Sequence, residues 1–295
     1  MPTLTSLDPA WLAKLEALRL SVRQVRWGSR MGGRFVINRR GSSIEFADYA
    51  AYTPGDDIRA IDWNLYARSD RLFVRTYKEE IELSVEVLLD ATASMGLPIP
   101  EKFARACRLG LMLAYIGLAG HHHVRLSAIQ PGLPQATAWC FHRADLQRLS
   151  GWTASLVAQG QVAWHEWMRK ALPALRMRGG QAILLSDGMI HPADFFLTIH
   201  LLMMRHLEVK VIQILSPQEH DPAQLFRGGV LVDSETGLTH ELDYRPSDLA
   251  RAVVEHNEQL ARFCKRHGVP FAQHRLDESL ETFVLKTLPA RGFLE

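Results

Sequence analysis

The feature that most constrains the fold is an alternation of apolar strands and helical segments that begins at residue 83. LSVEVLLD, ending at Asp90, and QAILLSD, ending at Asp187, are short aliphatic runs typical of buried strands. Helical patterns follow over 102–119, 143–157, 163–176 and 193–206, and further strands are indicated at 123–129 and 209–215. This alternation predicts a doubly wound α/β domain whose mostly parallel sheet has helices on both faces.

Composition narrows the class of protein. The 295 residues are 47% hydrophobic and 22% charged, with a formal net charge of +2, which is typical of a globular chain with a full core. The three cysteines are odd in number and widely spaced, so neither a disulfide framework nor a thiolate zinc site is expected. Because no uncharged apolar run approaches roughly 18 residues, we expect a cytoplasmic protein without membrane contact.

The same patterns divide the chain in two. Residues 1–82 are expected to form an N-terminal appendage, with a helix over 7–20, short strands, and a turn in TPGDD. Residues 83–295 are expected to form the α/β domain. Its regular alternation is interrupted over 217–245, where VLVDSETGLTHELD indicates an inserted hairpin that turns at Thr236–Gly237.

Oxygen-bearing side chains follow two of the predicted strands. Asp90, Thr92 and Ser94 lie in LLDATASM, and Asp187 lies in LLSDG. Ligands of such sheets bind beyond the carboxyl ends of the strands, and hard oxygen groups are the ligands that Mg²⁺ prefers. The pattern therefore predicts a divalent-cation site. A simpler interpretation stays open, in which the hydroxyls cap the next helix and Asp187–Gly188 forms an ordinary turn.

These four residues resemble the metal-ion-dependent adhesion site of von Willebrand factor A domains. In that site D-x-S-x-S is followed by a distal Thr and then an Asp; Thr92 stands here for the first Ser. The resemblance implies a Mg²⁺ ion that can accept a carboxylate from a protein partner. The distal Thr is missing, because the corresponding loop, AQGQVAW, has Gln161 and Val162 and no hydroxyl.

A longer stretch, from Gly41 to Glu80, resembles the signature of the bacterial family called domain of unknown function 58. The matching residues are Glu45, Phe46, Asp48, Tyr52, Pro54, Gly55, Asp56, Asp57, Arg59, Ile61, Asp62, Trp63, Ala67 and Arg68, whereas Ala50 stands where the family has Arg. The resemblance implies a von Willebrand A-like domain and a non-enzymatic, chaperone-like or adaptor role with a MoxR-type AAA+ ATPase.

The charged residues of this signature have two interpretations. Asp56, Asp57, Arg59, Asp62 and Arg68 are predicted either to form a partner-binding face or to satisfy one another and nearby backbone groups in tight turns.

Two other functions are alternatives. A metal-dependent hydrolase would use Asp90 and Asp187 around Mg²⁺, but no general base or phosphate-binding loop accompanies them. Nucleic-acid binding would use the basic residues of 14–40, which are Lys14, Arg19, Arg23, Arg26, Arg30, Arg34, Arg39 and Arg40. We expect it to be the weaker alternative, because no stacking aromatic pattern accompanies these charges.

Overall fold

The structure is a computed structural model that describes residues 9–22, 45–54, 58–78, 83–173, 180–220, 230–232, 239–241 and 246–295. The chain divides into two compact units, of which the smaller is Val25–Glu82. The larger unit combines Met1–Gln24 with Leu83–Glu295.

A six-stranded sheet forms the centre of the larger unit, in the order β10-β7-β6-β3-β4-β5. The strands are β3 (Ser84–Asp90), β4 (His123–Ile129), β5 (Gln135–Ala136), β6 (Gln181–Ser186), β7 (Glu208–Leu215) and β10 (Phe271–Arg275). Every neighbouring pair is parallel except β4 and β5, where the short edge strand runs antiparallel. The predicted mostly parallel α/β fold is confirmed.

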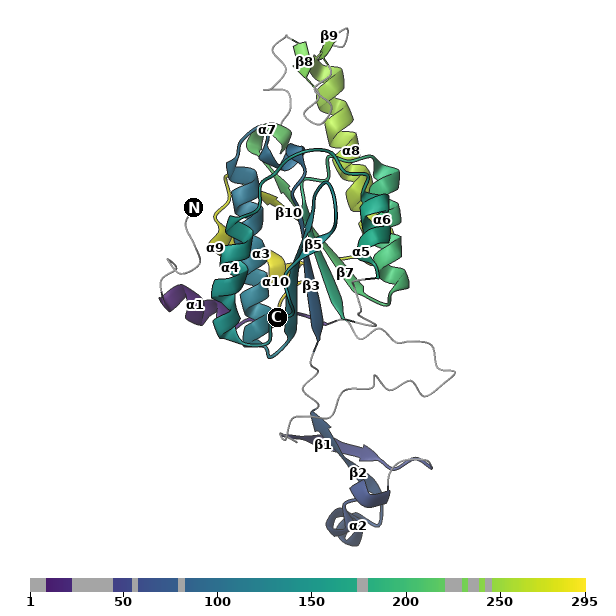
Figure 1. Ribbon diagram of the computed structural model, residues 1–295. Coiled ribbons are helices and arrows are strands. Elements are labelled where there is room, and N and C mark those ends of the chain that lie inside the picture. Colours follow the sequence, from purple (N-terminus) through teal and green to yellow (C-terminus); the bar gives the residue numbers. More distant parts are fainter. Residues whose placement is uncertain are drawn as a thin grey trace. The chain divides into compact units, whose positions relative to one another are not determined.

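Helices cover both faces of this sheet (Figure 1). The first face carries α1 (Pro9–Glu16), α3 (Glu101–Ala119), α4 (Leu146–Ala154) and the closing turns α9 (Leu280–Thr282), η6 (Phe283–Thr287) and α10 (Leu288–Ala290). The second face carries α5 (Trp164–Ala171), α6 (Pro192–Met204) and α8 (Pro246–Arg266). The short elements η3 (Ala93–Gly96), η4 (Arg143–Asp145) and α7 (Pro217–His220) lie in the connections.

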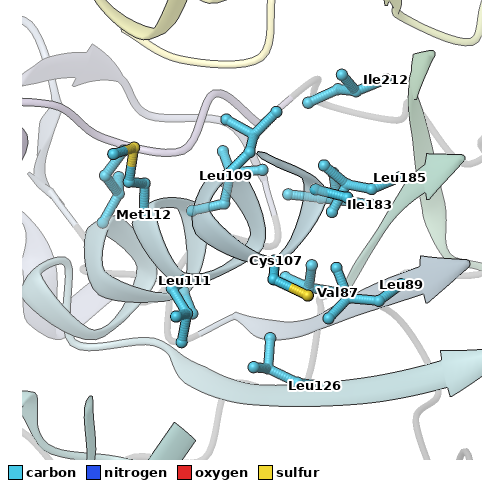
Figure 2. Close-up of a cluster of buried hydrophobic side chains, with 14 of the residues drawn as sticks. Val87, Leu89, Cys107, Leu109, Leu111, Met112, Leu126, Ile183, Leu185 and Ile212 are labelled. Atoms are coloured by element: carbon cyan, nitrogen blue, oxygen red, sulfur yellow. The ribbon is translucent and has the colours of Figure 1, made fainter. Parts of the chain in front are cut away.

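The strands are aliphatic throughout because both faces of the sheet are buried. On the first face, Val87 and Leu89 of β3 and Ile183 of β6 pack against α3, as Figure 2 shows. Gly110 allows α3 to approach closely, since a Cβ atom there would lie 2.9 Å from Cδ2 of Leu89. The helix is therefore held directly over the two strands that end in the candidate site.

The N-terminal helix departs from the expected division of the chain. Leu15 is fully buried in the core under α3, and Leu20 forms a β-bridge with Leu294. The described residues 9–22 thus belong to the larger unit, whereas the sequence placed them in the appendage. The reason is that the apolar face of α1 gains its partners from parts of the chain far away in sequence.

The smaller unit is a two-stranded antiparallel sheet of β1 (Glu45–Ala51) and β2 (Phe73–Lys78), with η2 (Ile58–Ala60) and α2 (Trp63–Ser69) between the strands. Asp62 caps α2, and its carboxylate accepts hydrogen bonds from the amides of Asn64 and Leu65, each at 3.0 Å. At the other end of α2, Asp70 adopts φ 52°, which terminates the helix.

The predicted insertion contains two short strands, β8 (Val230–Val232) and β9 (Thr239–Glu241), which pair antiparallel as a hairpin should. Its turn at Thr236–Gly237 lies outside the described residues. Of the helices in the described ranges, none combines the length and the apolar character needed to cross a bilayer.

Candidate functional site

The carboxyl ends of β3 and β6 bring the two predicted aspartates together. Asp90 is the last residue of β3, and Asp187 directly follows β6, the neighbouring parallel strand. Ser186 links the two ends, because its hydroxyl donates a 2.6 Å hydrogen bond to Oδ2 of Asp90. Both aspartates are fully buried.

The hydroxyls predicted from the sequence complete this cluster. The amide and the hydroxyl of Thr92 both donate to Oδ1 of Asp90, at 3.0 and 2.7 Å. The Thr92 hydroxyl proton is therefore engaged, so the 3.1 Å contact between Thr92 Oγ1 and Ser94 Oγ is donated by Ser94. Ser94 is the most exposed of these four residues, with 8% of its area exposed. The structure thus gathers Asp90, Thr92, Ser94 and Asp187 at one edge of the sheet.

The sequence did not predict the positively charged residue of this cluster, which is Lys102. The Nζ atom of Lys102, in the first turn of α3, lies 2.8 Å from Oδ2 of Asp187 and 2.5 Å from Oε1 of Glu219. Burial lowers the pKa of Lys102, but the charges of Asp187 and Glu219 outweigh burial and hold the pKa above its usual value. The ammonium group therefore stays charged inside the protein.

Asp90 has different surroundings. Burial and, after it, the charge of Asp187 raise the pKa of Asp90 to about 7, although hydrogen bonds from Ser186 and Thr92 oppose the shift. In the described part of the chain, no lysine or arginine forms an ion pair with Asp90. The cluster consequently holds three carboxyl groups and one ammonium group.

The donor set does not fit the Mg²⁺ ion that the sequence implied. The loop expected to carry the distal hydroxyl does meet the Asp90 turn, since Ala93 N–H donates to the carbonyl of Gly160 at 2.9 Å, but Gly160 has no side chain to offer. Asp187 already neutralises Lys102. Among the described residues, no group of three or more His, Cys, Asp or Glu side chains is arranged to hold a metal ion, and this includes the consecutive histidines 121–123.

Three loops around the cluster expose large apolar side chains. Leu97, Leu133 and Val157 are 48%, 80% and 60% exposed. The loop that carries Val157 touches the other two: Gln159 N–H donates to the carbonyl of Ala91, and a Cβ atom on Gly160 would lie 2.6 Å from Cγ of Pro131. We call Leu97, Leu133 and Val157 the apolar rim. Sequence reasoning did not identify the rim, because each residue stands alone in its own loop.

The charged signature residues fall into three groups. Asp62 is only 3% exposed, caps α2 and accepts a 3.0 Å hydrogen bond from the Tyr49 hydroxyl, which favours the second of the two interpretations for this residue. Arg59 and Arg68 are exposed. Asp56 and Asp57 lie outside the described residues.

The basic segment is described only in part. Lys14 forms a 2.7 Å ion pair with Glu281, and the guanidinium of Arg19 donates to the carbonyls of Glu16 and Leu18. The arginines from 23 to 40 lie outside the described residues.

Comparisons with known proteins identify a family that this chain matches. A sequence model described as "Protein of unknown function DUF58" matches residues 48–262. An uncharacterized protein of Mycobacterium bovis is 26% identical over 96% of this chain and 90% of its own length. Among solved structures, the conserved hypothetical protein BatB of Bacteroides thetaiotaomicron is similar, with a TM-score of 0.43, 15% identity, and coverage of 71% of this chain and 96% of that one. A von Willebrand factor type A structure from Catenulispora acidiphila has a TM-score of 0.30 and 16% identity, over 64% of this chain and 43% of that one.

Proposed function

We propose that this chain, which belongs to the DUF58 family of proteins of unknown function, is a non-enzymatic adaptor that binds a protein partner at the carboxyl edge of its sheet. The observation that carries the proposal is the apolar rim. Leu97, Leu133 and Val157 are exposed on three loops at this edge, and the loop that carries Val157 contacts the other two. Exposed apolar side chains on adjoining loops are what a protein interface covers. At the same edge, the buried cluster fixes the turn that leads into the Leu97 loop, because Thr92 donates two hydrogen bonds to Asp90.

Burial of the acidic groups supports binding over catalysis. A hydrolase needs at least one carboxylate or its metal in contact with the substrate, whereas Asp90 and Asp187 have no exposed surface. Their oxygens accept hydrogen bonds or ion pairs from Thr92, Ser186, Lys102 and Met189. Such a cluster fixes loop geometry and presents no free reactive group.

The partner that we propose is a MoxR-type AAA+ ATPase. The family signature over 41–80 is the reason for choosing it, and the rim supplies a surface on which it could dock. The alternative mechanism is Mg²⁺-dependent binding. In that mechanism the partner would bind through a Mg²⁺ ion held by Asp90, Thr92, Ser94 and Asp187.

A binding measurement with matched variants tests the function. Leu133→Asp should weaken binding to the ATPase about 10-fold or more, because binding would bury a carboxylate that has no partner in an apolar interface. Met204→Asp is the control: Met204 is 75% exposed but lies at the far end of α6, away from the carboxyl edge. Binding should be measured without nucleotide, so that the Mg²⁺ bound to the ATPase's own nucleotide does not affect the measured affinity.

Two outcomes would contradict this assignment. Equal affinity for Leu133→Asp and wild type would exclude the rim as the interface. Loss of binding with Arg59→Ala alone would place the interface on the smaller unit instead. If Asp90→Ala and EDTA each weakened nucleotide-free binding while the fold remained intact, the Mg²⁺-dependent mechanism would replace the metal-free one.

A further inference from the structure

Lys102 is an unusual residue for its position. Its side chain is fully buried, and it is the second residue of α3, where the positive end of the helix dipole disfavours another cation. A buried ammonium group is strongly unfavourable unless it is paired. Lys102 has two carboxylate partners, Asp187 and Glu219, at 2.8 and 2.5 Å.

Both partners are held in place from their other sides. The second oxygen of Asp187 accepts from the amide of Met189 at 2.9 Å, and its carbonyl accepts from Nε2 of Gln213 at 2.8 Å. The second oxygen of Glu219 accepts from the amide and the hydroxyl of Ser216, at 2.8 and 2.9 Å. Through Lys102, the start of α3 is therefore joined to the end of β6 and to α7, the short helix that follows β7.

A divalent cation bonded to Asp187 would compete with this arrangement. Mg²⁺ and Ca²⁺ bind carboxylate oxygens at about 2.0–2.6 Å, and the Lys102 ammonium already lies 2.8 Å from Oδ2 of Asp187. Two cations at one buried carboxylate repel each other strongly. In addition, the neighbouring loop meets the Asp90 turn at Gly160, which has no side chain to supply a further oxygen ligand.

We propose that the Lys102 ammonium group takes the place of a divalent cation at this edge of the sheet. It neutralises Asp187, cross-links three segments of the fold, and lets the site form without metal. This inference concerns the free chain and does not depend on the partner proposed above.

Thermal unfolding with and without metal tests the inference. The midpoint of the wild-type chain should be the same in EDTA and in millimolar MgCl₂ or MnCl₂. Lys102→Met should lower the midpoint in EDTA by roughly 10 °C, because removing one member of a buried ion pair leaves uncompensated charge. Mg²⁺ or Mn²⁺ should then recover at least half of that loss, by occupying the position that the ammonium group has left.

Lys210→Met is the matched control. Lys210 is also fully buried, but its ammonium group donates to the backbone carbonyls of Ser21 and Phe293, and the carboxylate of Glu208 lies farther away, at 3.9 Å. Its replacement should lower the midpoint as well, but no divalent ion should restore it. If a divalent metal restores the midpoint of Lys102→Met but not that of Lys210→Met, the metal replaces the missing ammonium group. A general stabilising effect of metal on a weakened protein would restore both.

Three results would overturn the proposal. The first is a wild-type midpoint that rises in Mg²⁺ and loses this response in Asp90→Asn. The second is a Lys102→Met variant as stable as wild type in EDTA, and the third is a destabilised Lys102→Met variant that metal does not rescue. If Lys102→Met fails to fold, electron paramagnetic resonance of Mn²⁺ mixed with the wild type decides: we expect no bound Mn²⁺, and one Mn²⁺ per chain, lost in Asp90→Asn, would refute the inference.

Discussion

At the scale of single residues, buried polar side chains divide into those with partners and those without. Glu86 is buried in β3, where Arg125 forms a 2.8 Å ion pair with it and the Ser127 hydroxyl donates to it. His274 in β10 is also fully buried, but neither ring nitrogen has a hydrogen-bond partner in the described structure. Because histidine is titratable, the burial of His274 without a hydrogen-bond partner makes stability depend on pH.

Replacing His274 should reduce the loss of stability in acid. Burial, and after it the charge of Arg105, lower the pKa of His274 from 6.5 to about 4, although Asp277 opposes the shift; Glu278 lies 3.6 Å away. The unfolded chain therefore binds the proton more readily, and His274 contributes stability that is present above pH 6.5 and is lost as the pH falls toward 4.

For a shift of this size the loss by pH 4 is on the order of 3 kcal/mol. Urea unfolding of His274→Leu between pH 7 and pH 4 should show a correspondingly shallower decline than wild type. His200→Leu, a change at an exposed histidine, serves as the control. Identical pH profiles for His274→Leu and wild type would refute this assignment.

At the scale of elements, the short helix α2 depends on its cap. The helix has seven residues, none of them buried, so packing contributes little to holding it. Asp62 instead satisfies two amides of the first turn and the Tyr49 hydroxyl of β1. Capping matters most in a helix of this length, because short helices are marginal by themselves.

Asp62→Ala should therefore loosen α2 in the full chain. Losing the cap costs about 1 kcal/mol, so hydrogen exchange at the amides of Asn64 and Leu65 should accelerate about 5-fold. Asp62→Asn retains an accepting oxygen and should exchange nearly as wild type does. Equal protection in all three proteins would show that the cap does not hold the helix.

At the scale of the whole molecule, the segment around Arg19 and the segment around Glu295 pair with each other in the larger unit. The backbone of Arg19 pairs with Glu295 in both directions, at 2.8 and 2.9 Å, and the ammonium group of Lys210 in β7 donates to carbonyls of Ser21 and Phe293. The first helix is therefore part of the α/β core, although the smaller unit follows it in the sequence.

Leu15→Ala should destabilise the larger unit by about 2–5 kcal/mol, as is typical of a large-to-small change in a core. Urea unfolding followed by tryptophan fluorescence reports mainly on that unit, which holds five of the seven tryptophans, at positions 11, 139, 152, 164 and 167. Leu15→Met, which preserves volume, should cost less than about 1.5 kcal/mol. If residues 9–22 were a separate appendage, Leu15→Ala would leave this transition unchanged.

The sequence by itself determined the α/β fold and the position of the Asp90 cluster. Aliphatic runs, their spacing and the acidic strand ends are local patterns, and adjacent parallel strands place their carboxyl ends at one edge. Only the tertiary structure decided the placement of α1 and the cation at the site. Lys102 lies 85 residues from Asp187 and 117 from Glu219, and a lysine in a helical first turn has no local feature that marks it as buried. Its burial follows from the packing of α3 against the sheet, which brings the ammonium group between two carboxylates.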